Sequence, residues 1–178
     1  KDFNPTSVTG NFADPTVPTN FHPFNIQNLG GSLYVTYAQF ELAFGSLDRG
    51  FVRKFDTNGV RDMAFKIDNG PLANPWGIAI SPANFGGFSN ALLVGNSRLL
   101  GIPEDSCISA FNPATGALIG SMVNEGGGGL KIDQLRALVF GNGVNGGEPN
   151  TLYFSAGLFL DQHGLFGSLK PASVANST

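Results

Sequence analysis

The sequence predicts an all-β protein, specifically a β-propeller of about three four-stranded blades that would make half of a six-bladed ring. Apolar runs of five to seven residues recur between Gly, Pro, Asn and Asp, which is typical of short strands joined by turns. No longer stretch keeps the 3.6-residue period of an amphipathic helix. A pair of strands also recurs, with Gly31, Asn90 and Asn150 at equivalent positions 59 and 60 residues apart. A four-stranded unit repeated at such a spacing is typical of a propeller blade.

A β-sandwich is the competing fold, since several short strands and turns also describe that class. Sandwiches need not repeat internally, so the recurring strand pair favours the propeller. At 178 residues the chain is long enough for one domain with one sizeable core. The 25 Gly and 11 Pro are spread along the chain as turn residues, and the 16 Phe indicate aromatic packing between strands.

The composition argues against two classes of partner. A net charge of −3 gives no general electrostatic attraction to nucleic acid or to an anionic membrane. No apolar run reaches the roughly 18 residues of a membrane-spanning helix. The densest cationic pair, Arg53-Lys54, is interpreted as a solvated strand face. Cys107 is the only cysteine, so no disulfide forms within the chain. Its strand-like surroundings indicate a small buried hydrophobe, with a reactive thiol or an interchain link as the alternative.

The chain divides into an N-terminal arm, three blades and a tail. The arm, residues 1–20, has three prolines and no sustained periodicity, which predicts an extended segment with one strand around 8–12. The first blade spans 21–67, with strands expected at 24–29, 33–38, 51–55 and 60–67. Gly30-Gly31 is a hairpin signal because both residues tolerate positive φ. Asp56-Thr57-Asn58-Gly59 is a second turn, in which Asp and Asn bond the local backbone.

The second blade spans 70–123 and the third 130–170, followed by a tail at 171–178. In the second blade, strands are expected at 76–81, 91–96, 107–111 and 117–123, with a longer excursion at 98–106. The third blade is expected to hold strands at 135–140, 151–156 and 165–169, and no convincing fourth strand follows.

Seven segments within these blades, taken as a set, resemble a known family. They are 23–31 (PFNIQNLGG), 33–38 (LYVTYA), 74–79 (NPWGIA), 93–96 (LVGN), 140–143 (FGNG), 150–154 (NTLYF) and 163–167 (HGLFG). Together they look like an uncharacterised, secreted family of NHL-like β-propellers, some of which carry a PEP-CTERM surface-sorting tail. The resemblance covers roughly residues 10–170. It implies a six-bladed fold in proteins about twice this length, with this chain similar to their C-terminal half, and an extracellular location. The excursion at 98–106 is longer than in the family, and the sorting tail is absent.

Three blades do not close a ring, because propellers have roughly four to eight. An open arc exposes blade faces that neighbouring blades would cover. Three explanations are open: the chain, which starts at Lys1 without a leader, is a piece of a longer protein; two chains complete one ring as a homodimer; or the N-terminal arm covers the arc. We expect a fragment or a dimer rather than a free monomer.

The first strand of each propeller blade lines the central channel, so its polar residues are the natural ligand contacts. The aligned candidates are His22, Asn25, Asn74, Asn96, Asp133 and Arg136. In this alignment Trp76 falls opposite Phe24 and Leu135 and is expected to pack between blades, with Gly77 allowing close approach. Oxygen atoms of such a set could hold Ca²⁺. The alternative is that these side chains cap strand ends and satisfy backbone donors.

Two hypotheses about function follow. The preferred one is a secreted, non-enzymatic propeller that acts as a scaffold for binding a protein, a small molecule or a carbohydrate. The other is a hydrolase or lyase assisted by a Ca²⁺-type metal in the channel, using His22, Asn74, Asp133 and Arg136. A third, purely structural role is also open. His163, next to Asp161, could be an oriented base, and a simple turn explains it equally well. The sequence has no nucleophile elbow, paired-Cys metal motif, P-loop or dinucleotide fingerprint.

Overall fold

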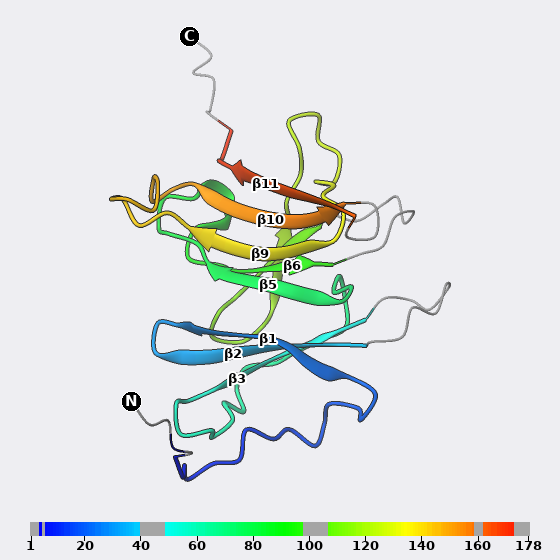
Figure 1. Cartoon of the computed structure of the whole chain (residues 1–178), viewed down its shortest axis with the longest axis vertical. Coiled ribbons are helices and arrows are strands. Elements are labelled where there is room, and N and C mark those ends of the chain that lie inside the picture. Colours follow the sequence, from blue (N-terminus) through cyan, green and yellow to red (C-terminus); the bar gives the residue numbers. More distant parts are fainter. Residues whose placement is uncertain (1–3, 5, 40–48, 98–106, 159–161, 173–178) are drawn as a thin grey trace.

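The protein is all-β in its computed structural model, which describes residues 4, 6–39, 49–97, 107–158 and 162–172. The described strands form three antiparallel sheets, and within each sheet neighbouring strands are consecutive in the sequence. The all-β prediction is therefore confirmed. The sheets form an open stack within the described part of the chain, so the ring itself stays a prediction (Figure 1).

The first sheet has four strands, with Gly30 and Gly31 at positive φ in its first turn. Its strands are β1 (His22–Leu29), β2 (Ser32–Ala38), β3 (Phe51–Phe55) and β4 (Ile67–Asp68). The predicted outer strand over 60–67 is not continuous: Ile67 and Asp68 form β4 against β3, and Arg61 makes an isolated bridge with Phe55. The chain turns earlier because the Asp62 carboxylate accepts a hydrogen bond from the Ala64 amide at 3.0 Å. Such side-chain bonds to the local backbone compete with a strand ladder.

The second sheet also has four strands, close to the predicted ranges. They are β5 (Pro75–Ile80), β6 (Leu92–Asn96), β7 (Ile108–Phe111) and β8 (Leu118–Ser121), with a short 3₁₀ helix, η1 (Gly86–Phe88), between β5 and β6. The excursion predicted at 98–106 lies outside the described residues. The third sheet consists of β9 (Leu135–Phe140), β10 (Leu152–Leu158) and β11 (His163–Leu169). Four strands per unit thus holds for two sheets, whereas the third has three in the part of the chain described.

Three hydrophobic cores alternate with the three sheets. The first and second sheets share one core, which contains Tyr34, Val52, Ile78 and Phe111. The second and third share another, which contains Leu93, Ile108, Leu138 and Phe154. The third core lies on the other face of the first sheet, where Val35, Phe51 and Phe55 pack with Phe21 of the arm. Strand β5 lies between β1 and β9, so the first strands of the three sheets are neighbours.

The N-terminal arm covers the outer face of the first sheet, at the end of the stack away from the third sheet (Figure 1). The strand predicted around 8–12 is absent from the described arm residues. Instead, the amides of Gly10 and Phe12 donate to the carbonyls of Asn58 and Gly59 at 2.8 and 3.1 Å. The Phe12 ring packs against Phe55 with centroids 6.0 Å apart. The arm is thus attached to the turn after β3 rather than paired as a strand.

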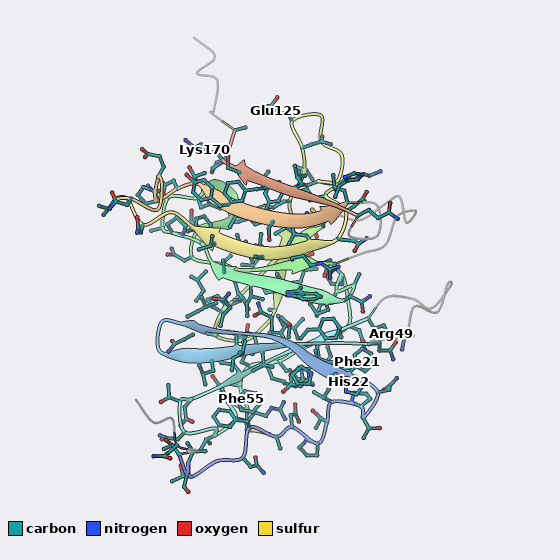
Figure 2. The ribbon with its side chains drawn as sticks, viewed as in Figure 1. Phe21, His22, Arg49, Phe55, Glu125 and Lys170 are labelled. Carbon is teal, nitrogen blue, oxygen red and sulfur yellow. The ribbon has the colours of Figure 1, made fainter. Side chains whose placement is uncertain are left out.

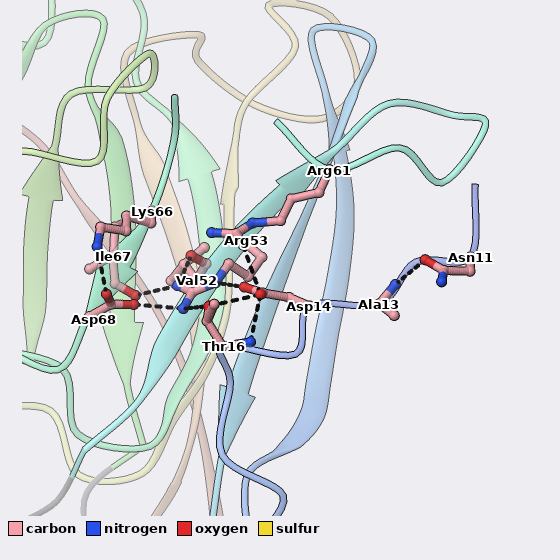
Figure 3. A network of polar contacts seen from close by, with 10 residues as sticks. All are labelled: Asn11, Ala13, Asp14, Thr16, Val52, Arg53, Arg61, Lys66, Ile67 and Asp68. Atoms are coloured by element: carbon pink, nitrogen blue, oxygen red, sulfur yellow. Dashed lines mark hydrogen bonds and ion pairs between the residues drawn. The ribbon is translucent and has the colours of Figure 1, made fainter. Parts of the chain in front are cut away.

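Arg53 anchors the arm, and its interpretation as part of a solvated face was wrong. Arg53 is 1% exposed, and its Nε donates to the buried carboxylate of Asp14 in the arm. Its Nη1 donates to the carbonyls of Val52 and Ile67, both at 3.0 Å, and its Nη2 lies 2.7 Å from Asp68. Arg61 reaches the other Asp14 oxygen at 2.7 Å (Figure 3). A buried guanidinium needs such compensation, because desolvation of an unpaired charge costs several kcal/mol.

The described residues include no helix with the length and apolar character needed to cross a membrane.

Candidate functional site

The first strands of the three sheets share one irregularity, a β-bulge near the start of the strand. The pairing register shifts between Pro23 and Asn25 in β1, and between Pro75 and Ile78 in β5. In β9, Leu135 pairs with Ala156 and Ala137 with Ser155, which leaves Arg136 as the extra residue. A bulge re-aims the side chain of its extra residue, and bulges are frequent next to binding sites.

The bulges bring three side chains into one stack, which we call the inner-strand column: Phe24, Trp76 and Arg136. The Phe24 ring meets the Trp76 ring edge to face, with centroids 5.0 Å apart and an interplanar angle of 89°. The Arg136 guanidinium carbon lies 4.4 Å from the Trp76 ring centroid, within the range of a cation–π contact. All three side chains are only partly buried, so the column is accessible from solvent.

Gly77 and Asn25 hold the strands of the column together. A Cβ atom on Gly77 would lie 3.0 Å from the main chain of β9, so glycine permits the close approach that was expected of it. The Asn25 amide donates to the Trp76 carbonyl at 2.9 Å, which links β1 to β5. The side-chain nitrogen of Asn25 is therefore engaged with the neighbouring strand.

The sequence alignment of the third unit was wrong by one residue. Gln134, not Asp133, occupies the position of Asn74, because both residues have positive φ, 48° and 50°. Their carbonyls also accept equivalent hydrogen bonds, from Gly157 at 3.0 Å and from Ser97 at 2.9 Å. The shift places Arg136 opposite Trp76, where Leu135 was expected. The bulge is common to all three strands and shifts none of them relative to the others. The error arose because Arg136 stands where the other strands have an aromatic ring, so the apolar Leu135 was matched to Phe24 and Trp76 instead.

Gln134 and Ser97 complete the polar side of the column. Arg136 donates to the Gln134 side-chain oxygen at 2.9 Å and to the Ser97 hydroxyl at 3.0 Å. Gln134 is 3% exposed, and its Nε2 has no acceptor among the described residues. A buried donor without a partner costs about 1–3 kcal/mol, so it marks a place where an acceptor would be favourable. Neither residue was a candidate from the sequence, and only the positive φ that Gln134 shares with Asn74 identifies it.

Asn96 has a structural role in this arrangement. Its side chain is buried, its oxygen accepts from the Ala73 amide at 2.9 Å, and its nitrogen donates to the Pro71 carbonyl at 2.8 Å. Asn96 therefore fixes the loop that leads into β5. This agrees with the alternative interpretation given above, in which such side chains bond the backbone near strand ends.

The remaining candidates lie around the column without forming a metal cluster. His22 is exposed at the start of β1 (Figure 2). Asn74 and Asp133 are partly buried. In the described ranges, no group of three or more His, Cys, Asp or Glu side chains is close enough to hold a metal ion. The calcium site and the channel hydrolase stay predictions.

Cys107 and His163 differ in their environments. Cys107 is 5% exposed, and burial raises the pKa of its thiol to about 11, which suppresses the thiolate at neutral pH. His163 is exposed at the start of β11, and Asp161, its predicted partner, lies outside the described residues.

Comparisons with known proteins identify relatives but no activity. The chain is similar to two uncharacterized proteins of Acanthamoeba polyphaga mimivirus. One is 32% identical over 91% of this chain and 38% of the relative. The other is 30% identical over 91% of this chain and 41% of the relative. The chain therefore spans about two fifths of the length of these curated relatives. No family model matches the sequence, and no solved structure matches it.

Proposed function

We propose that the protein is a binding module of the β-propeller class, with its ligand site at the inner-strand column. The observation that carries the proposal is the bulge repeated in β1, β5 and β9, which directs one side chain per sheet into the same accessible stack. Consecutive antiparallel strands in each sheet, with the first strands side by side, support the propeller class.

The column favours a ligand that offers oxygen acceptors next to an apolar surface. Gln134 Nε2 is a buried donor without an acceptor in the described structure. The oxygen of the same amide orients Arg136, whose partly accessible side chain supplies donors that a ligand can reach. Trp76 and Phe24 supply aromatic surface beside these donors. Aromatic lining with a few placed polar groups is typical of small-molecule sites. A carbohydrate combines hydroxyl oxygens with apolar ring faces, and we propose this class first.

Trp76 provides the experiment, because it is the only tryptophan in the chain. We expect its fluorescence to change in a saturable way on titration with a neutral oligosaccharide panel. Gln134→Leu, which removes the amide and keeps a similar volume, is expected to weaken binding at least tenfold, or about 1.4 kcal/mol. Gln27→Leu, in β1 outside the column, is the matched control and is expected to bind like the wild type.

Two results would contradict the proposal. One is a Trp76 signal that responds to no oligosaccharide at millimolar concentrations. The other is equal binding by the wild type and Gln134→Leu, provided that circular dichroism shows both proteins folded.

A further inference from the structure

The outer face of the third sheet is uncharged and largely apolar, and no residue in the described part of the chain packs over it. We call it the open face; it consists of Ala137, Val139, Tyr153, Ser155, Phe166 and Ser168, none of which is charged. Phe166 is 74% exposed and Val139 59%. The Tyr153 and Phe166 rings are stacked at 9° with centroids 6.1 Å apart. Large exposed apolar patches on a soluble protein mark interaction sites.

The internal repeat indicates what covers a face of this kind. The strand registers pair Thr36 with Val52 in the first sheet, Gly95 with Ile108 in the second, and Ser155 with Phe166 in the third. Phe166 therefore holds the position of Val52 and Ile108, which are both 0% exposed in the cores between sheets. In the first two sheets, this face is covered by the next sheet of the stack. The open face thus has the character of a sheet-to-sheet interface.

The opposite end of the stack carries a complementary hollow. A cleft of about 370 Å³ lies over β1 and β2, and its lining includes Phe12, Pro23, Ile26, Val35 and Tyr37. Ile26 is 56% exposed there, because the arm covers the β3 side of the sheet and leaves the β1 side accessible. No charged side chain lines the cleft. An uncharged, largely apolar face at one end is thus accompanied by an uncharged cleft at the other.

We propose that two copies of this chain associate head to tail, with the open face of each seated in the β1–β2 cleft of the other. If the three sheets span half of a ring, as the sequence predicts, such a pair has twofold symmetry and two identical contacts, and association ends at the dimer. The arm stays bound, because it covers the β3 side and forms one wall of the cleft through Phe12. This interface adjoins the inner-strand column, because Phe24 and Asn25 also line the cleft. Its test measures the oligomeric state without an oligosaccharide, so it does not depend on the ligand proposed for the column.

Light scattering combined with analytical ultracentrifugation over a range of concentrations tests the dimer. We expect the wild-type mass to double with concentration, and Phe166→Glu and Ile26→Glu each to remain monomeric. Mixing these two variants is expected to restore a dimer, since one of its two contacts then joins an unaltered open face to an unaltered cleft. Val144→Glu and Met63→Glu, at positions 78% and 75% exposed outside both surfaces, are controls expected to dimerise normally.

Three outcomes would overturn the proposal. A wild type that stays monomeric at every concentration excludes the second copy. Loss of the dimer in Phe166→Glu but not in Ile26→Glu shows that two open faces pair with each other. Growth beyond the dimer shows that the head-to-tail contact does not close. Circular dichroism confirms the fold of each variant, and Phe166→Ser and Ile26→Ser serve as milder variants if either glutamate prevents folding.

Discussion

The two ends of the stack expose different surfaces although both are faces of similar sheets. At the first sheet, the arm covers the outer face with Phe21 and with the Asp14 carboxylate, which pairs with Arg53 and Arg61. At the third sheet, the described residues include no such cover for the outer face, and Phe166 is 74% exposed. The capped end contains buried ion pairs, whereas the open face contains no charged side chain.

This difference shows how an apolar sheet face can be covered in two ways. A covering segment of the same chain needs a specific anchor, since an extended arm buries little apolar surface by itself. Asp14 is that anchor, because it pairs with two arginines of the first sheet (Figure 3). A second sheet needs no such anchor, because it buries a broad apolar face.

The largest effect is expected from removing the anchor. Asp14→Ala leaves Arg53 and Arg61 without their shared carboxylate, and breaking a buried pair in this way lowers the free energy of unfolding by about 3–5 kcal/mol. Urea denaturation measures the change. The control is Asp62→Ala, which breaks the more exposed Lys54–Asp62 pair at 3.0 Å and is expected to cost about 1 kcal/mol or less. Equal losses in the two variants would show that the arm contributes no special stability.

The same anchor predicts a dependence on pH. Burial alone would raise the pKa of the Asp14 carboxyl, but hydrogen bonds from Thr16 and from Arg53, with the charge of Arg53, hold it below its ordinary value of 3.8. The folded state therefore favours the ionised carboxylate, and this stabilisation is complete above about pH 5 and is lost as the pH falls through the folded-state pKa. We expect the stability difference between the wild type and Asp14→Asn to shrink below about pH 4. A constant difference down to pH 3 would contradict this.

The next prediction compares the loss of unfolding free energy at two equivalent positions, one between sheets and one on the open face. Ile108→Ala removes a fully buried side chain between two sheets and is expected to cost about 2–5 kcal/mol in unfolding free energy. Phe166→Ala, at the equivalent position of the third sheet, is expected to change stability by about 0.5 kcal/mol or less. Both are measured by urea denaturation at a dilution where the chain is monomeric. A large loss for Phe166→Ala under these conditions would show that part of this chain covers the open face.

The smallest effect has the opposite sign. Thr36 is 0% exposed, and its hydroxyl has no partner within the described structure. Thr36→Val keeps the shape and removes the unpaired hydroxyl, so we expect the melting temperature to rise, corresponding to a gain of about 1 kcal/mol. Ser155→Val, at the equivalent position of the open face, is expected to have little effect. Destabilisation by Thr36→Val would reveal a hydrogen bond to this hydroxyl.

Much of the fold could be predicted from alternating apolar residues and turn chemistry. The strands at 51–55 and 135–140 were predicted with the observed bounds, because Gly, Asp and Asn delimit them. Arg53 was misinterpreted because a charge at an alternate strand position usually faces water. Its partner, Asp14, lies 39 residues away in an arm without periodicity, so nothing local connects the two.

The site was less predictable than the fold. The sequence identified Asn25 and Arg136, which bond at or beside the column, but not Gln134 or Ser97. The cause is a change of residue type, because Arg136 stands where β1 and β5 have Phe24 and Trp76. Matching apolar residues therefore placed Leu135 there and moved the unit by one residue. Bulges arise from tertiary packing, and neither hydrophobic periodicity nor turn residues indicate them here.

The three bulges also have a consequence for engineering. The same backbone irregularity carries Phe24, Trp76 and Arg136, so its geometry does not depend on one type of side chain. Each bulge is therefore a backbone position that accommodates either an aromatic or a cationic side chain. A library that varies these three residues together would build new recognition surfaces, one side chain per sheet, on an unchanged main chain.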